Sequence, residues 1–410
     1  MGKTIERLED IENTQDRQLV QLLRNLVQIP SWPIIDSENN VVKQSENGVV
    51  DFLEDWIRQN TTLQTVRQSL DQGRYNLIAS KGNPDLVFLA HTDTVAPSVG
   101  SPYDQLAAEI HDGKIWGRGT TDMKSGIATM LQAISLTPNA NNLWAIFYAD
   151  EEFDFLGMKA LVRDYSELRP NLIVSSDGSD LKLGHGCRGL MEIKFRLRGQ
   201  TGHAAKGNGL NAIDGVFDTI TETRKYLAKY MHPIMGPTSM NLAYLLGGTE
   251  LPGGESFTGN GELVRVGKEG NVIPDLAEFI LDIRPSSPDL TVDKITEFMS
   301  GVAIERGYKF EINGVRHNLG AWYTDVNQIE TFREIAKQVT GKKVQFDNPG
   351  RSGYIDLQML WEATGRPPAF MFGGGVGATS HKPDEHIEIE SLIKERDFFQ
   401  KVLEKIKAKR

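Results

Sequence analysis

The chain has 410 residues, more than one ordinary hydrophobic core organises, so we expect two domains. Its formal net charge of −10 argues against nucleic acid or an anionic membrane as the main partner. No run of about 18 apolar residues would span a membrane, and the charged start, Met1–Asp10, lacks the apolar segment of a secretion signal. The single cysteine, Cys187, excludes an internal disulfide framework. Together these features predict a cytoplasmic protein.

The first part of the chain alternates between strand and helix patterns. We expect helices over 16–28, 48–60, 123–136 and 157–165, and strands over 76–80, 85–90, 143–149 and 172–176. Polar residues follow several of these strands directly, as they do at the edge of an α/β sheet. The pattern predicts a two-domain α/β protein with a mainly parallel sheet and a site at the strand ends.

From about residue 184 the pattern changes. We expect strands over 190–198, 238–246 and 277–283, helices over 211–227 and 292–306, and a glycine-rich loop over 247–261. Strand and helix patterns then alternate again over 324–339, 354–364 and 369–372. We therefore predict a main domain formed by residues 1–185 and 301–410, interrupted by an inserted α+β domain at residues 186–300.

Side chains that bind metals or transfer protons lie beside these expected elements: His91, Asp93, Asp122, Glu151, Glu152, Asp177 and His381. Histidine nitrogens and carboxylate oxygens without cysteine suit zinc, cobalt or manganese, and one carboxylate between two ions would bridge them. Divalent ions lower the pKa of a water molecule, and a nearby carboxylate can take its proton. The set predicts a metal-dependent hydrolase.

Each residue also has a purely structural interpretation. His91–Asp93 can be a turn, and Asp122 can cap the helix that follows it. Asp177 precedes a glycine in an ordinary turn pattern, His381 can belong to a surface loop, and most acidic pairs are solvated. The adjacent Glu151 and Glu152 are better candidates for two separate roles, because neighbouring side chains at a strand end point in different directions. One can then bind metal while the other accepts a proton.

Four segments in order, Leu89–Val95, Gly117–Gly126, Asp150–Glu152 and His381–Glu385, resemble the motifs of the M20 metallopeptidases. That family includes carboxypeptidases, a desuccinylase, acetylornithine deacetylase, aminoacylases and dipeptidases. The resemblance extends over nearly the whole chain. It implies a two-metal catalytic domain that is interrupted by a lid or dimerisation domain. The two divalent ions would be zinc, with cobalt or manganese as alternatives.

The resemblance also implies roles for the metal-binding side chains. His91 and His381 would each hold one metal, Asp122 would bridge the two, and Glu152 and Asp177 would complete the ligand set. Glu151 would be the general base, Asp93 would orient His91, and the peptide bond between Asp122 and Met123 would be cis.

In the inserted domain, Gly199–Ala204 resembles the family segment whose histidine reaches a neighbouring subunit. His203 would therefore stabilise the oxyanion in a homodimer. Asn271, Arg284 and Arg188 would hold a substrate carboxylate, since a planar guanidinium can bind it through two hydrogen bonds.

The sequence thus predicts hydrolysis of an amide or peptide bond in a small carboxylate-bearing molecule or short peptide, with a metal-activated water as nucleophile. Two departures from the family pattern leave the substrate open. An aspartate at position 177 favours a dipeptidase or aminopeptidase over a deacylase, and the loop Gly350–Asp356 differs from the Ser-Asp or Thr-Asp of many members. The alternatives are an inactive metal- or peptide-binding relative and a TIM-barrel amidohydrolase. The second needs a His-x-His pair that the eight histidines do not provide.

Overall fold

The computed structural model describes residues 5–36, 41–251, 266–351 and 353–407. The start Met1–Asp10, the glycine-rich loop 247–261 and the loop Gly350–Asp356 lie partly outside these ranges. The chain forms two compact units, the first from Met1–His185, Thr324–Asp347 and Ile355–Arg410 and the second from Gly186–Tyr323 and Asn348–Tyr354.

The second unit extends past residue 300, where we expected the inserted domain to end. Position 300 lies inside helix α6 (Val292–Glu305), and the chain continues into strand β18 (Lys309–Leu319). Strand β18 pairs along its length with β12 (Leu190–Arg198), which keeps it in the second unit.

A seven-stranded sheet forms the centre of the first unit, in the order β10-β20-β9-β5-β8-β4-β3. Its strands are β3 (Gln64–Ser69), β4 (Tyr75–Lys81), β5 (Leu86–His91), β8 (Leu143–Tyr148), β9 (Leu172–Ser175), β10 (Leu183–Gly184) and β20 (Ala369–Phe372). The neighbours β20, β9, β5 and β8 run parallel, while the outer pairings are antiparallel. Parallel neighbours bring their carboxyl ends to one edge, so the predicted α/β fold with a parallel centre is confirmed.

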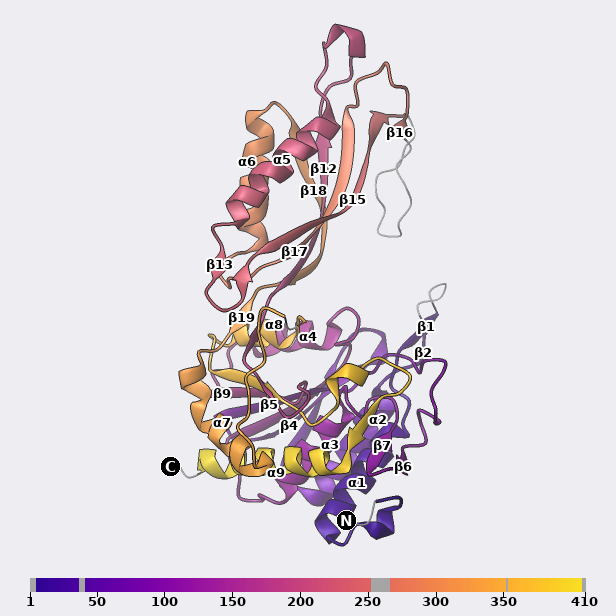
Figure 1. Cartoon of the computed structure of the whole chain (residues 1–410), viewed down its shortest axis with the longest axis vertical. Helices are drawn as coiled ribbons and strands as arrows, with labels where there is room; N and C mark the ends of the chain where they lie inside the picture. Colours follow the sequence, from indigo (N-terminus) through magenta and orange to yellow (C-terminus); the bar gives the residue numbers. More distant parts are fainter. Residues whose placement is uncertain (1–4, 37–40, 252–265, 352, 408–410) are drawn as a thin grey trace. The chain divides into compact units, whose positions relative to one another are not determined.

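Helices cover this sheet: α1 (Thr14–Val27), α2 (Asn47–Asn60), α3 (Lys124–Ser135), α4 (Leu156–Tyr165), α7 (Val326–Thr340), α8 (Leu357–Ala363) and α9 (Ile389–Lys407). Leu77, Phe88 and Ala145 on one sheet face join α1, α2, α3, α7 and α9 in a single hydrophobic core. Figure 1 shows α4 and α8 on the opposite side of the sheet from α3 and α9. Among the described residues, no helix is both long and apolar enough to cross a membrane.

Helices α1, α5 (Ala212–Leu227) and α7 each begin after a residue whose side chain caps the helix. The carboxamide of Asn13 accepts the N–H groups of Gln15 and Asp16 at 2.8 and 3.1 Å at the start of α1. Asn211 and Asp325 cap the following helices α5 and α7 in the same way. Such caps satisfy N–H groups that a helix leaves unpaired, which fixes the first residue of each element.

Two smaller sheets complete the first unit. Strands β1 (Ile34–Asp36) and β2 (Val41–Gln44) pair antiparallel between α1 and α2. Strand β7 (Lys114–Trp116) pairs with β6 (Glu109–His111) on one side and β21 (His386–Glu388) on the other. The pairing of β21 with β7 brings the segment after His381 beside the segment that leads to Asp122.

The second unit is an antiparallel sheet in the order β16-β15-β17-β12-β18, with helices α5 and α6 on one face (Figure 1). Its remaining strands are β11 (Gly186–Cys187), β13 (Met231–His232), β14 (Gly236–Pro237), β15 (Ser239–Glu250), β16 (Val266–Gly267), β17 (Leu276–Arg284) and β19 (Trp322–Tyr323). Alternate residues of β12, namely Met191, Ile193, Phe195 and Leu197, are buried against the helices. This alternation matches the strand pattern of the sequence.

Candidate metal centre

The predicted metal-binding residues of the first unit follow the carboxyl ends of neighbouring parallel strands. His91 is the last residue of β5, Glu151 and Glu152 follow β8, and Asp177 follows β9. Because β8, β5 and β9 are adjacent in the sheet, these side chains share one edge. Asp122 reaches it from the loop before α3.

Asp122 lies between the two histidines. Its Oδ1 is 3.0 Å from Nε2 of His91, and its Oδ2 is 3.2 Å from Nε2 of His381. The hydroxyl of Ser380 donates to the same Oδ2 at 2.7 Å. The peptide bond between Asp122 and Met123 is cis, as the family resemblance predicts. One carboxylate that presents an oxygen to each of two imidazoles has the arrangement that a bridging ligand requires.

Glu152 completes a compact donor set. Its Oε1 lies 2.8 Å from Nε2 of His381, and ligand atoms of His91, Asp122 and Glu152 lie within 4.8 Å of one another. These nitrogen and oxygen donors fit zinc, cobalt or manganese. The charge of Asp122 acts on Asp177, so the two side chains are close. The carboxylate of Asp177 does not, however, join the converging ligand atoms of His91, Asp122 and Glu152.

Asp93 contacts both the histidine and the acidic turn. Nδ1 of His91 is 3.0 Å from the main-chain oxygen of Asp93 and 3.5 Å from its Oδ1. The two carboxylate oxygens accept the N–H groups of Glu151 and Glu152, each at 3.1 Å. Asp93 therefore contacts His91 and also fixes the backbone of the two glutamates, which the sequence did not indicate.

The electrostatics follow from burying many acids together. Burial and the charge of Asp356 raise the pKa of the Glu151 carboxyl well above its usual value. Burial, reinforced by the charge of Asp122, raises the pKa of Asp177 to about 7. Hydrogen bonds to Asp122 and Glu152 raise the pKa of His381 to about 10. An excess of buried negative charge of this kind favours binding of cations.

Tyr148 and Asp356 form a pair that sequence reasoning missed. The hydroxyl of Tyr148 donates to Oδ1 of Asp356 at 2.8 Å, and both side chains are buried. Burial raises the pKa of Asp356 to about 8, although the bond from Tyr148 lowers it. The only available signal was the position of Asp356 at the end of the divergent loop Gly350–Asp356.

The four remaining predicted residues all belong to the second unit. His203 is exposed and lies beside Asn271, because the N–H of Ala204 donates to the Asn271 carbonyl at 2.9 Å. The guanidinium of Arg188 donates to the Met235 carbonyl at 2.6 and 3.1 Å.

Arg284 is held by its neighbour Asp282 through two hydrogen bonds of 2.7 and 2.9 Å. Its guanidinium also lies 5.7 Å from the ring centre of Tyr354. The structure thus brings His203 and Asn271 together, and it restrains both arginines within the second unit.

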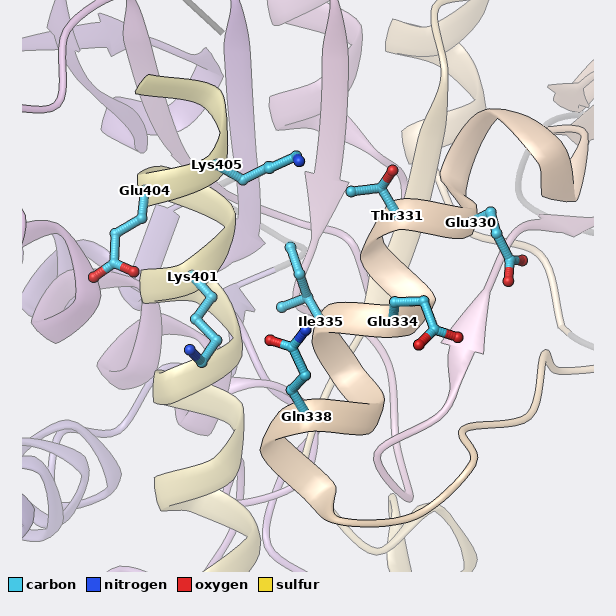
Figure 2. A pocket seen from close by; sticks show the side chains of 8 residues that line it. All are labelled: Glu330, Thr331, Glu334, Ile335, Gln338, Lys401, Glu404 and Lys405. Atoms are coloured by element: carbon cyan, nitrogen blue, oxygen red, sulfur yellow. The ribbon is translucent and has the colours of Figure 1, made fainter. Parts of the chain in front are cut away.

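A surface groove of about 580 Å³ lies in the first unit, between α7 and α9 (Figure 2). It is lined by Glu330, Thr331, Glu334, Ile335, Gln338, Lys401, Glu404 and Lys405. The acids of α7 pair within their own helix, Glu330 with Arg333 and Glu334 with Lys337. Mixed charges of this kind are typical of a solvated groove between helices.

Known proteins resemble the chain over nearly its full length. Residues 87–405 match the sequence profile of peptidase family M20/M25/M40. Acetylornithine deacetylase of Erwinia tasmaniensis is 24% identical over 404 residues, which cover 94% of this chain and 96% of that protein.

Solved structures show the same fold. Aminopeptidase PepT of Bacillus cereus superposes with a TM-score of 0.68 at 19% identity, covering 96% of this chain and 99% of that one. The YXEP protein of Bacillus subtilis, described as a dinuclear metal-binding peptidase, gives 0.62 at 14% identity, covering 96% and 98%.

These matches define the chain as a hydrolase that acts on amide or peptide bonds. It belongs to peptidase family M20/M25/M40. The expected class of enzyme is thereby confirmed.

Proposed function

We propose that the chain is a di-zinc hydrolase that cleaves an amide or peptide bond in a small substrate with a free carboxylate. The observation that carries the proposal is the position of Asp122, with one oxygen at His91 and the other at His381. Together with Glu152 and Asp177, these residues would hold two divalent ions, with cobalt or manganese as alternatives to zinc. When bound, the ions would lower the pKa of a water molecule and polarise the scissile carbonyl.

Glu151 moves the proton in the proposed reaction. It takes a proton from the attacking water and then delivers it to the leaving amine, while Asp93 holds its N–H and keeps the carboxylate directed. The raised pKa of Glu151 makes its carboxylate a stronger proton acceptor than an exposed glutamate. Glu151 and Glu152 thus divide proton transfer and metal binding between them.

We further propose that the active form is a homodimer in which His203 of the partner subunit stabilises the oxyanion. Asn271, Arg188 and Arg284 hold the substrate carboxylate in this proposal. The exposure of His203 supports it, because an exposed imidazole in the second unit is available to a second copy. Mixing His203→Ala and Glu151→Ala chains tests it: both are inactive alone, and mixed dimers regain activity only if the histidine acts across the interface.

The substrate belongs to one of two groups. An N-acyl amino acid agrees with the similarity to acetylornithine deacetylase, whereas a dipeptide or the N-terminus of a peptide agrees with the aspartate at position 177. We place the enzyme in the cytoplasm, because a chain with one cysteine, Cys187, has no internal disulfide framework and suits a reducing compartment. A panel of N-acetyl amino acids, N-succinyl amino acids and dipeptides, assayed with added Zn²⁺ or Co²⁺, separates the two groups. No cleavage of any member under metal-loaded conditions would contradict the proposal.

A further inference from the structure

Glu385 joins the two chain segments that carry Asp122 and His381. It lies four residues after His381, and only 2% of its surface is exposed. Its Oε1 accepts three main-chain N–H groups, those of Gly119, Thr121 and Asp122, at 3.0, 2.9 and 3.2 Å. The last of these N–H groups is that of Asp122, whose side-chain carboxylate lies between the two histidines.

The loop before Asp122 is shaped to receive this carboxylate. Gly119 has a φ of +85°, and a Cβ there would lie 3.0 Å from the side chains of Lys124 and Thr94. This backbone conformation turns successive N–H groups toward one point, which makes an anion-binding concavity. The N–H of Gly117 also donates to the main-chain oxygen of Glu385 at 3.0 Å. The contact is therefore a built feature of both segments.

Arg118 balances the charge of Glu385. Its Nη1 pairs with Oε2 of Glu385, and only 1% of the arginine is exposed. Its Nη2 reaches the hydroxyl of Ser98 at 3.1 Å and the carbonyl of Lys382, one residue after His381, at 3.4 Å. Burial raises the pKa of Glu385, while Arg118 and the N–H groups of the loop lower it. One guanidinium and one carboxylate thus tie together both metal-binding segments.

We infer that Glu385 is a positioning residue that sets the backbone of Asp122 relative to His381, so that the two oxygens of Asp122 face two metal sites at once. The inference rests on the proposed function, which gives Asp122 its role as a bridge. Glu385 acts through Asp122 and contacts no substrate. Residues that orient metal ligands change metal affinity or activity by about 10–100-fold when they are replaced.

Glu385→Gln tests the inference, because glutamine keeps the size but directs an amide donor at Arg118 or at the N–H groups of the loop. Glu388→Gln is the matched control, since Glu388 is exposed at the end of strand β21 (His386–Glu388), which begins one residue after Glu385. Metal-free proteins are titrated with Co²⁺ by calorimetry, the visible spectrum of bound Co²⁺ is recorded, and kcat and KM are compared.

We expect Glu385→Gln to bind Co²⁺ about 10–100-fold more weakly, with an altered spectrum, a lower kcat and little change in KM. Glu388→Gln should behave as the unmodified chain. Unchanged Co²⁺ affinity, spectrum and kcat in folded Glu385→Gln would overturn the inference. If this variant does not fold, Arg118→Lys decides: weaker Co²⁺ binding supports the inference, and unchanged binding overturns it.

These readouts are independent of the proposed reaction. If the unmodified chain binds metal but cleaves no substrate, the proposed function fails, while the affinities and spectra still decide the role of Glu385.

Discussion

Arg74 connects helix α2 to the turn that carries Glu151. Its Nε and Nη2 bind both carboxylate oxygens of Glu46 at 2.9 and 3.1 Å, and its Nη1 binds Oδ1 of Asp150 at 2.7 Å. The three side chains are 3%, 0% and 5% exposed. Replacing Arg74 with methionine would therefore leave two buried carboxylates without their shared cation.

The cost of this change follows from the burial. Removing one partner of a buried ion pair destabilises a protein by about 3–5 kcal/mol. For a large domain, each kcal/mol lost lowers the melting temperature by roughly 2–4 °C. The melting temperature of the first unit should therefore fall by about 6–20 °C. The other oxygen of Asp150 accepts the N–H groups of Asp154 and Leu156 at 3.1 and 3.2 Å, so the turn that positions Glu151 should also loosen and kcat should fall.

Thermal unfolding followed by circular dichroism measures the effect. The control is Arg163→Met, because Arg163 pairs with Asp164 where the two side chains are 67% and 37% exposed. Exposed ion pairs contribute about 0–1 kcal/mol, so the control should shift the transition only slightly. Equal shifts for the two variants would refute the reasoning that burial makes the Arg74 network costly to break.

Three further results follow from the structure. Burial raises the pKa of Glu395 to about 8 from its usual 4.5, so the folded chain keeps a proton that the unfolded chain releases. The contribution of this group to stability is complete below pH 4.5 and is lost as the pH rises toward 8. Glu395→Gln should therefore lessen the fall in melting temperature between pH 5.5 and 8.5. A Cβ at Gly373 would lie 2.1 Å from the carbonyl oxygen of Gly178 and 2.9 Å from that of Ser176, on either side of Asp177, so Gly373→Ala should weaken Zn²⁺ binding in calorimetry by about tenfold or more. Removing the metals with a chelator should abolish hydrolysis, and added Zn²⁺ or Co²⁺ should restore it; activity that survives complete metal removal would contradict the metal centre.

The sequence predicted those features that local patterns determine. Alternation of strand and helix gives the fold class, and a strand end followed by a polar residue places His91 and Glu152 at one edge of the sheet. The ion pair of Arg118 with Glu385 and the contacts of Arg74 could not be predicted, because they join residues far apart in the chain.

The domain boundary shows the same limit. A strand pattern over 309–319 fits either sheet, and only its pairing with β12 assigns it to the second unit. Local periodicity indicates that a strand forms but does not identify its neighbour.

The division of roles between Glu151 and Glu152 is the central claim, and one variant tests it most directly. Glu151→Ala should retain two divalent ions per chain, counted by elemental analysis, because the proposed ligands remain in place. Its turnover should fall by about 10²–10⁴-fold, the usual contribution of a general base. Near-normal turnover in the metal-loaded variant would contradict the account.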